Sequence, residues 1–408
     1  MHILLIADGR SPITKHWING LLGMNITVSL ISTYPCSSIP GIKEIYILPV
    51  AFAGFSGSQV KQKTEEESSN QKTGKSRSLI SRFRDTFLSA RYTLGPMTLP
   101  FYRFQYRLLV QRINPDLVHA LRIPYEGMLA AATPEEFPLI VSTWGNDLTF
   151  HAYGSAGMRK ATKQCLSRAN GLTSDTKRDV RLSRQWGFDY EKPSLVIPGA
   201  GGIDLMKMNR LRSEGARLMG GLLPENVPLV INPRGFRPGS VHNDVFFKSI
   251  PMVLNHKPDV KFLCVAMQGQ AEALQWIQSL NIEDSVELLP YYSQQEALWH
   301  LFQKAEISVS ISSHDGTPNS LLEAMANGCF PIAGDIESLR EWITPGVNGL
   351  LIEPTKPEAL ASAILQALDN PELRQSAAVH NQRIITERAE VSLVQAQLQV
   401  FYQRFLAR

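Results

Sequence analysis

The sequence predicts an α/β protein made of two doubly wound parallel-sheet domains. A chain of 408 residues is long enough for two or three domains of ordinary size. Short apolar segments alternate with helical segments in two separate series, and the series change between about Asp204 and Pro224. The predicted domains are therefore residues 1–205 and 206–386. Apolar residues at helical spacing predict a terminal helix over 387–408.

The first series starts with a buried strand, His2–Asp8, which is too short and too acidic at its end for a signal peptide. A short loop leads into a helix at Ile13–Leu22. Further strands are predicted at Ile26–Ser32, Asp116–His119, Leu139–Thr143, Gly171–Ser174 and Leu195–Pro198, with a helix at Arg159–Asn170. Residues 56–78 are polar and free of aromatics, which is typical of a mobile surface loop.

The second series consists of five apolar runs separated by helical or polar segments. The predicted strands are Val227–Asn232, Val260–Ala266, Val286–Leu289, Ile307–Ser313 and Phe330–Ala333. No apolar run reaches the ~18 residues that a membrane span requires. The four cysteines are scattered without a C-x-x-C pair, which favours a reducing compartment and argues against a zinc site or a disulfide framework.

The most informative segment lies between the fourth and fifth of these strands. The strand ends at an acidic turn that contains Asp315, and a helix follows, with Thr317 as the expected N-cap, Pro318 at its first position and Gly328 at its end. The free N–H groups at such a helix start suit an anionic ligand. Asp315 and Glu323 could hold hydroxyl groups of that ligand, so the segment predicts a nucleotide-sugar site.

This segment resembles the donor-binding signature of glycosyltransferase family 4, retaining enzymes with the GT-B fold, usually written E-x7-E. Here Asp315 and Glu323 are separated by seven residues and followed by Ala324-Met325-Ala326 and Pro331. The family usually has Glu at the first position, so Asp315 is a shortened version. The resemblance implies that Asp315 binds the donor sugar and Glu323 the ribose. The alternative is that Asp315 is an ordinary turn residue and that Glu323 is a solvated position on the helix.

The resemblance implies a donor site and a fold in which the two domains face a central cleft and the terminal helix crosses back to the first domain. The implied donor-binding residues are Gly9, Arg234, Arg237, Asp315, Gly316, Thr317, Pro318, Asn319, Ser320 and Glu323. Arg234 ends a strand where the family places an Arg that pairs with the donor diphosphate, as its fork geometry allows. The lysine that usually follows is missing. Arg237 could replace it, His242 or Lys248 could reach in, or the diphosphate is held more weakly.

The first domain departs more from the family and supplies weaker candidates for acceptor binding. Arg10 follows Gly9 where other members have paired glycines. Trp144 stands where many members have a histidine, and could stack on a sugar or belong to the core. Asp147 either caps the next helix or contacts the acceptor. His119 matches a family histidine, and an ordinary hydrogen-bonded strand-end histidine is the alternative.

Retaining transfer in this family is thought to use the departing diphosphate itself to deprotonate the acceptor hydroxyl. Such chemistry needs positioning and stabilisation of negative charge. The predicted catalytic residues are therefore Arg234 and Asp315. The sequence contains no Asp-x-Asp motif, so neither a metal nor another cofactor is expected. The donor is expected to be UDP- or GDP-linked, and the acceptor a glycan or a lipid-linked glycan of the cell envelope or capsule.

The charge is unevenly distributed. Residues 1–200 contain 24 lysines and arginines against 15 acids, whereas the remaining residues contain 17 against 22. Between Lys72 and Arg112 the cations are interleaved with aromatic and aliphatic residues, as on helices that lie on anionic membranes. The alternative is a pair of amphipathic helices with solvated Arg faces. No nucleic-acid motif accompanies the charge. A cytoplasmic protein, peripheral on the inner membrane face, is expected.

Two other functions share this fold. One is a GT-B epimerase or phosphorylase, which the signature and the missing pyridoxal-binding lysine motif disfavour. The other is a catalytically degenerate GT-B protein that binds a nucleotide or glycan without transfer. The altered phosphate lysine and Trp144 favour this second alternative.

Overall fold

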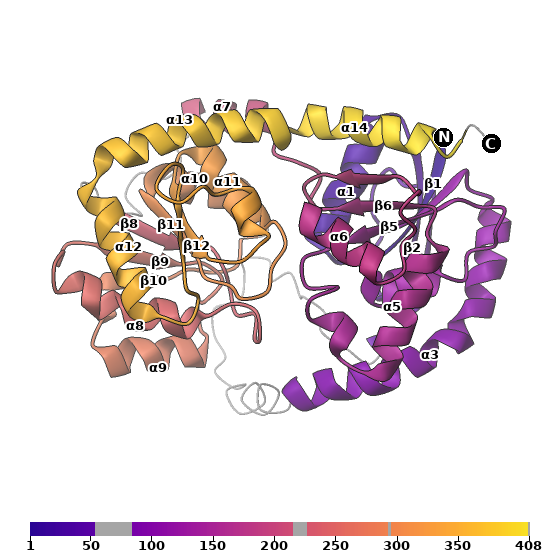
Figure 1. Cartoon of the computed structure of the whole chain (residues 1–408), viewed down its shortest axis with the longest axis horizontal. Coiled ribbons are helices and arrows are strands. Elements are labelled where there is room, and N and C mark those ends of the chain that lie inside the picture. The colour runs from indigo at the N-terminus through magenta and orange to yellow at the C-terminus, as the bar shows by residue number, and fades with distance from the viewer. Residues whose placement is uncertain (54–83, 215–226, 293–294, 407–408) are drawn as a thin grey trace, which may run out of the picture. The chain divides into compact units, whose positions relative to one another are not determined.

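The computed structural model describes residues 1–53, 84–214, 227–292 and 295–406 (Figure 1). The loop predicted at 56–78 lies outside the described residues, as do Arg77 and Arg82 of the basic segment. The contacts divide the chain into two compact units. Unit 1 comprises Met1–Ser174, Asp179–Leu195 and Gln399–Arg408, and unit 2 comprises Asp175–Arg178 and Val196–Leu398. The predicted ranges placed this division later, between residues 205 and 206.

Unit 1 is built on a sheet with the strand order β3-β2-β1-β4-β5-β6-β7 in the described part of the chain. Its strands are β1 (His2–Ala7), β2 (Thr27–Ser32), β3 (Glu44–Ile47), β4 (Leu117–Ala120), β5 (Leu139–Thr143), β6 (Gly171–Ser174) and β7 (Ser194–Val196). Neighbouring strands from β3 to β6 are parallel. Because β1 lies between β2 and β4, the strand order reverses at β1 and β4, which is where ligands bind in such sheets.

The helices of unit 1 are α1 (Pro12–Gly23), α3 (Arg84–Ile113), α4 (Met128–Ala130), α5 (Ala156–Arg168) and most of α6 (Lys177–Gln185). Helix α5 begins before the predicted Arg159, because the Ser155 hydroxyl caps it by accepting from Met158 N at 3.0 Å. The part of the basic segment that the structure describes, from Arg84 onward, lies in helix α3, and Pro96 and Pro100 lie inside it.

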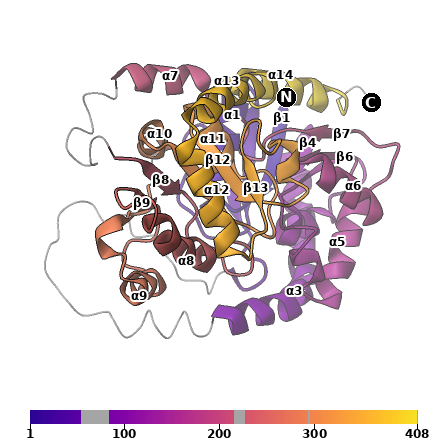
Figure 2. The ribbon, with the colours of Figure 1, turned by 60° about the vertical axis from the view of Figure 1, so that its left-hand side comes forward.

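Unit 2 has a sheet with the order β10-β9-β8-β11-β12-β13, and its neighbouring strands are parallel. Figure 2 labels β8, β9, β12 and β13 of this sheet. The strands are β8 (Leu229–Asn232), β9 (Lys261–Cys264), β10 (Val286–Leu288), β11 (Ile307–Ser310), β12 (Phe330–Gly334) and β13 (Leu350–Ile352). The order reverses at β8 and β11. The predicted fold class, two doubly wound parallel sheets, is confirmed.

Helices cover both faces of the unit 2 sheet. They are α7 (Leu205–Glu214), α8 (Asn243–Leu254), α9 (Ala271–Leu280), α10 (Gln295–Lys304), α11 (Asn319–Asn327), α12 (Pro357–Asp369) and α13 (Pro371–Arg388), and α14 (Val391–Gln403) follows. Strand β8 shows the two-sided burial: Val230 packs in one apolar cluster, and its neighbours Leu229 and Ile231 pack in the other. None of the described helices is long and apolar enough to cross a membrane.

Candidate active site

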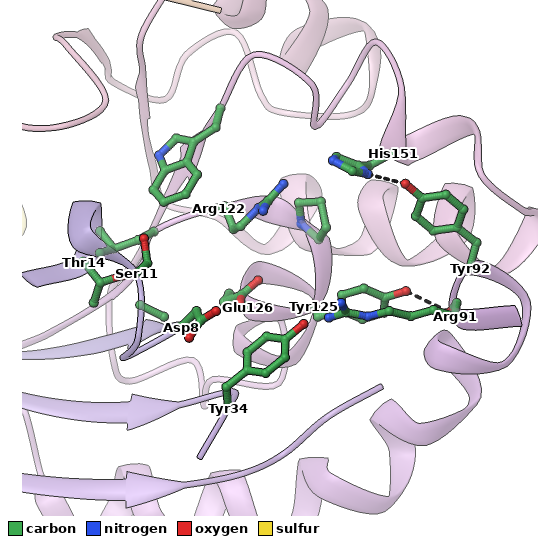
Figure 3. A pocket seen from close by; sticks show the side chains of 14 residues that line it. Asp8, Ser11, Thr14, Tyr34, Arg91, Tyr92, Arg122, Tyr125, Glu126 and His151 are labelled. Carbon is green, nitrogen blue, oxygen red and sulfur yellow. Dashed lines mark hydrogen bonds between the residues drawn. The ribbon is translucent and has the colours of Figure 1, made fainter. Parts of the chain in front are cut away.

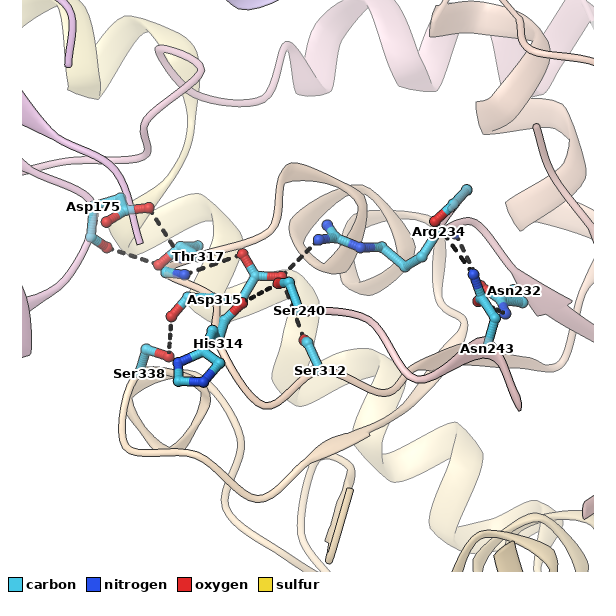
Figure 4. A network of polar contacts seen from close by, with 12 residues as sticks. Asp175, Asn232, Arg234, Ser240, Asn243, Ser312, His314, Asp315, Thr317 and Ser338 are labelled. Atoms are coloured by element: carbon cyan, nitrogen blue, oxygen red, sulfur yellow. Dashed lines mark hydrogen bonds and ion pairs between the residues drawn. The ribbon is translucent and has the colours of Figure 1, made fainter. Parts of the chain in front are cut away.

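The centre of the unit 2 site is an ion pair at the point where the strand order reverses. Arg234 follows β8 and Asp315 follows β11, and these strands are neighbours. The Arg234 Nη2 atom lies 2.6 Å from Asp315 Oδ2 (Figure 4). The Arg234 side chain is only 6% exposed and that of Asp315 16%. The two residues predicted to act in catalysis are therefore brought together.

Both members of the ion pair are held by their own loops. The Asp315 carboxylate also accepts from Ser312 Oγ at 3.3 Å and from the Gly316 N–H at 3.1 Å. The Ser338 hydroxyl donates to the Asp315 carbonyl. On the other side, the Arg234 N–H donates to Asn232 Oδ1 at 2.9 Å (Figure 4). These contacts fix the backbone on both sides of the pair, so the side chains are positioned before any ligand binds.

The start of α11 differs from the prediction. Pro318 occupies the N-cap position, without a side-chain cap, and the helix begins at Asn319. Thr317 does not cap it, because its N–H and hydroxyl donate instead to Asp175, at 3.0 Å to Oδ2 and 2.7 Å to the carbonyl. The predicted end is confirmed: Gly328 ends the helix with a φ of 85°.

Several polar atoms around the ion pair have no protein partner. Within the described residues, the buried atoms Arg234 Nε, Asn319 Oδ1 and Ser320 Oγ form no hydrogen bond. Buried polar atoms are nearly always paired in folded proteins, so an unpaired group at one place indicates a ligand site. Asn319 and Ser320 are the first residues of α11, where the backbone N–H groups also point out of the helix. This end of the helix can therefore hold an anion.

Glu323 is not a solvated helix position, since it is 3% exposed. Its Oε1 atom accepts from Trp299 Nε1 at 3.1 Å, from Asn319 Nδ2 at 3.0 Å and from Gln295 Nε2. Burial nevertheless raises the pKa of Glu323 to about 7, although the bonds from Gln295 and Trp299 act in the opposite direction. The carboxyl group therefore exchanges its proton near neutral pH, which is typical of residues at functional sites.

Arg237 is the best candidate for the second cation expected beside the donor diphosphate, in place of the family's lysine. The positive charge of Arg234 lowers the pKa of Arg237 to about 10, so the Arg237 guanidinium remains charged at neutral pH. The other candidates have partners of their own: Lys248 pairs with Asp244 at 2.9 Å, and His242 Nε2 lies 3.0 Å from Ser313 Oγ. Two cations that repel each other would both be stabilised by a dianion between them.

Unit 1 has a pocket of about 180 Å³ at the place where its own strand order reverses (Figure 3). Asp8 and Ser11 follow β1 on one side, and Leu121 and Arg122 follow β4 on the other. The walls are aromatic and charged: they include Tyr34, Arg91, Tyr92, Tyr125, Glu126, Trp144 and His151. Aromatic walls with a few charged groups suit a sugar that carries a phosphate.

The pocket is lined by both acidic and basic side chains, and some of these have partners in the protein. Arg122 pairs with Asp147 at 2.9 Å, and Thr33 donates to Glu126 at 2.7 Å. Burial raises the pKa of the Glu126 carboxyl and lowers that of His151 to about 4, so the histidine is neutral at pH 7. The buried Nε atoms of Arg91 and Arg122 have no partner within the described residues. These two N–H groups are available to an anionic ligand.

Tyr125 has an unusual backbone at the pocket wall. Its φ is 67° and its ψ is −48°, a conformation that non-glycine residues seldom adopt. The conformation places its ring 4.6 Å from the Arg91 guanidinium, and its hydroxyl donates to the Arg91 carbonyl at 2.8 Å. Tyr125 therefore connects the pocket to helix α3.

The predicted first-domain candidates occupy different places. Trp144 lines the pocket. Arg10 lies beside it, bonded through two nitrogens to Asp8 and 3.7 Å above the Tyr34 ring. The Gly9 N–H, expected to approach a diphosphate, is taken by Ser32 Oγ at 3.0 Å.

Asp147 and His119 are interior residues. Asp147 is fully buried; it does not cap a helix and instead accepts from Arg122, from the Ile123 N–H at 3.0 Å and from the Trp144 N–H at 3.2 Å. His119 is also fully buried, between Tyr402 Oη at 2.7 Å and Ser142 Oγ at 2.9 Å. Burial lowers the pKa of His119 to about 3. Its position matches the alternative of an ordinary hydrogen-bonded histidine.

The pocket residues Tyr34, Arg91, Tyr125 and Glu126 were not anticipated. Arg91 was assigned to a basic membrane-facing segment, and the structure directs it into the pocket instead. The available signal was the strand order: β1 and β4 are adjacent, so residues that follow both strands lie at one sheet edge.

Both units therefore define a two-domain α/β protein with a polar site at the reversal point of each sheet. Residues 240–382 match the family of glycosyl transferases group 1. The chain is 25% identical over 288 residues, 69% of each protein, to a GDP-mannose:cellobiosyl-diphosphopolyprenol alpha-mannosyltransferase of Xanthomonas campestris.

Two solved structures extend the likeness to the whole fold. A sucrose-phosphate synthase of Thermosynechococcus elongatus has a TM-score of 0.71 and 16% identity, with 100% of this chain and 99% of that chain covered. Anabaena HepE, solved in complex with UDP-glucose, has a TM-score of 0.66 and 16% identity, with 99% and 100% covered. The expected resemblance is confirmed: residues 240–382 match the group 1 glycosyl transferases, and the whole chain has the GT-B fold of the similar structures.

Proposed function

We propose that this chain is a retaining glycosyltransferase that moves a hexose from a UDP- or GDP-linked donor to a glycan or lipid-linked acceptor, in the synthesis of an envelope or capsule polysaccharide. The observation that carries the proposal is the cluster at the start of α11. The Arg234–Asp315 ion pair lies at the reversal point of the unit 2 sheet, Arg237 feels the charge of Arg234, and Arg234, Asn319 and Ser320 have buried polar atoms without a partner among the described residues.

In this proposal the donor lies along the start of α11. Glu323 accepts hydrogen bonds from the ribose hydroxyls and Asp315 from hydroxyls of the sugar. The diphosphate is held by Arg234 and Arg237, together with the N–H groups of Asn319 and Ser320. Binding exchanges part of the Arg234–Asp315 contact for contacts with the ligand, which uses the Arg234 Nε group that has no protein partner.

The proposed reaction keeps the configuration of the sugar. The bond from the sugar C1 atom to the diphosphate oxygen breaks, and its electron pair stays on the diphosphate. The acceptor oxygen forms a bond to C1 on the same face, and its proton passes to the departing diphosphate. Arg234 and Arg237 stabilise the developing negative charge, as a metal ion does in other transferases. We propose that the reaction needs no metal.

The acceptor is proposed to enter the unit 1 pocket. The tyrosines and Trp144 provide flat surfaces for sugar rings, and Arg91 and Arg122 offer N–H groups to a phosphate. The acceptor named for the Xanthomonas relative is a sugar attached to a diphosphopolyprenol, which combines both features. A lipid-linked acceptor agrees with a location at the inner face of the cytoplasmic membrane.

A panel of nucleotide sugars tests the proposal. A donor present at 100 times its Kd should stabilise the protein by about 2.7 kcal/mol in a thermal-shift measurement. The stabilising donor should then be consumed when a diphosphopolyprenol-linked saccharide is added, with an α-linked product for an α-linked donor. Inversion of the linkage, or dependence on an added divalent cation, would contradict the corresponding part of the proposal.

The second candidate is a GT-B protein that binds without transfer. It is favoured by the loss of the usual phosphate lysine and by Trp144 in place of the usual histidine. Slow hydrolysis of the bound donor separates the two: a transferase releases some free sugar in the absence of acceptor, and a binding protein releases none.

A further inference from the structure

Helix α3 is apolar on two opposite sides. Tyr92, Leu99, Tyr106, Val110 and Ile113 are at most 8% exposed and belong to the core of unit 1. Their spacing puts them on one face, which packs on α4 and α5. A helix at the surface of a domain ordinarily carries polar residues on the opposite face.

The opposite face of α3 is a row of large exposed side chains, here called the outer stripe. It consists of Leu94, Met97, Phe101, Phe104 and Leu108, with exposures of 47%, 72%, 72%, 69% and 50%. Successive members are three or four residues apart, so they share one face of the helix over about 20 Å. Five such residues in one row form a continuous patch, which indicates an interaction surface.

The surroundings of the outer stripe are basic. From Arg91 to Ile113 the sequence of α3 contains no Asp or Glu, and it includes Arg103, Arg107 and Arg112. Helix α5, which packs beside it, also has no acid and exposes Arg159, Lys160 and Lys163. The Arg103 guanidinium donates to Gln164 of α5 at 3.3 Å, which connects the two helices. The outer stripe therefore lies in a field of positive charge, without an acidic residue in the part of α3 that carries it.

We propose that the outer stripe of α3 is a docking surface for an anionic lipid bilayer, with the helix lying parallel to the membrane plane. Phenylalanine, leucine and methionine would enter the boundary between headgroups and acyl chains, and the cations of α3 and α5 would contact the anionic headgroups. The proposal rests on the proposed peripheral location and names its surface. A second copy of the chain fits less well, because a symmetric pairing of this face would bring the same cations together.

The docking face and the pocket share one helix. Arg91 and Tyr92 of α3 line the pocket, and the outer stripe begins two residues later at Leu94. A bilayer on the outer stripe would thus lie next to the element that helps to form the proposed acceptor pocket, as a lipid-linked acceptor requires.

Vesicle co-sedimentation of the full chain tests the proposal. The wild type should bind vesicles of phosphatidylglycerol and phosphatidylcholine at low salt. Phe101→Ser combined with Phe104→Ser should weaken this binding about tenfold or more, because two large apolar groups no longer enter the bilayer. The matched control is Met206→Ser combined with Val379→Ser, which removes two side chains that are 78% and 75% exposed on other helices. The control should bind like the wild type.

A second variant, Arg107→Gln combined with Arg112→Gln, tests the contribution of positive charge to vesicle binding. This variant should lose binding to phosphatidylglycerol vesicles and be indistinguishable from the wild type on pure phosphatidylcholine. Equal binding by the wild type and the double Phe variant would overturn the proposal, and so would a wild type that ignores anionic vesicles at low salt. A lipid-free wild-type dimer that the Phe variant converts to a monomer would assign the stripe to a second copy instead.

A separate measurement keeps this proposal apart from the proposed function. The Phe variant and its matched control should retain the wild-type melting temperature, and all variants should show the same thermal shift with UDP or GDP. If no nucleotide sugar is turned over and vesicle binding still depends on Phe101 and Phe104, the transferase proposal fails while the docking surface stands.

Discussion

Each unit has an arginine–aspartate ion pair beyond the ends of two neighbouring strands, β4 and β5 in unit 1 and β8 and β11 in unit 2, and the two pairs are built differently. In unit 1 the Asp147 side chain is fully buried, and both of its oxygens are used by Arg122 and two backbone N–H groups. In unit 2 the Asp315 side chain is 16% exposed, and its donors besides Arg234 are Ser312 and its own neighbour, Gly316. A carboxylate that is saturated by backbone holds a loop in place, whereas one with accessible oxygens can bind a ligand.

The comparison predicts different effects on folding stability and on activity when each ion pair is removed. Removing Asp147 should cost folding stability and leave donor binding unchanged. Removing a member of the unit 2 pair should cost activity, and it should cost less folding stability than the loss of Asp147. The four predictions below test this contrast, in order of decreasing effect.

The largest effect is expected at Arg234. Arg234→Ala should raise the barrier to transfer by about 2.7–4 kcal/mol, because a preorganised donor to the departing diphosphate is lost. Arg234→Lys should recover little of this, since a single ammonium group does not replace a two-pronged guanidinium. Both are measured as kcat/KM for transfer. Full recovery by lysine would show that only net charge matters at this position.

The next effect concerns folding. Asp147→Ala leaves the Ile123 and Trp144 N–H groups and the Arg122 guanidinium without their acceptor, so the free energy of unfolding should fall by about 2–3 kcal/mol. Urea denaturation measures this. The matched change Asp315→Ala should lower the free energy of unfolding by less than Asp147→Ala, since it leaves one backbone N–H group without its acceptor and not two. Equal losses in the two variants would remove the distinction between the ion pairs.

A smaller effect separates the two carboxylates of unit 2. Glu323→Gln should weaken the nucleotide sugar and the free nucleoside diphosphate alike, by about tenfold, because both contain the ribose. Asp315→Asn should impair transfer more than it weakens the free diphosphate, which has no sugar to lose. Calorimetric titration with the two ligands distinguishes these patterns. Wild-type transfer in both variants would refute the site assignment.

The smallest effect is the pH dependence of Glu323. Burial raises its pKa from 4.5 to about 7. In the range from pH 4.5 to 7 the folded protein binds a proton that the unfolded chain has released, so this group lowers stability as pH rises. Donor hydroxyls favour the carboxylate, so donor affinity should instead rise with pH up to about 7, by at most about tenfold per unit. Glu323→Gln should flatten both dependences, as followed by thermal unfolding and by titration at several pH values.

The sequence predicted the two-domain architecture and the unit 2 site more accurately than it predicted the unit 1 pocket. Strands with continuous apolar runs, such as β1 and β11, were recognised because burial on both faces leaves a clear pattern. The short strands β3 and β13 lacked such runs and were missed. The unit 2 site could be found because Asp315 and Glu323 are close in sequence, and a single turn and helix fix their relation.

The unit 1 pocket depends on residues that are distant in sequence. Tyr34, Arg91 and Tyr125 meet only because β1 and β4 are adjacent and α3 packs on them, which no local pattern reveals. Thr317 shows another limit of sequence-based prediction. Threonine is favoured as a helix N-cap, but the Thr317 hydroxyl donates to the Asp175 carbonyl instead. Asp147 likewise accepts hydrogen bonds from nearby backbone N–H groups, those of Ile123 and Trp144.

Gly316 has a consequence for altering the donor preference of this enzyme. A β-carbon at position 316 would lie 2.7 Å from Asp175 Cγ, so every other amino acid would displace the carboxylate that holds Thr317. Substitutions at position 316 would therefore disturb the contact between Asp175 and Thr317. Ser320 Oγ has no partner among the described residues, and a mutant library restricted to this position would sample ligand contacts without removing a hydrogen bond of that hydroxyl.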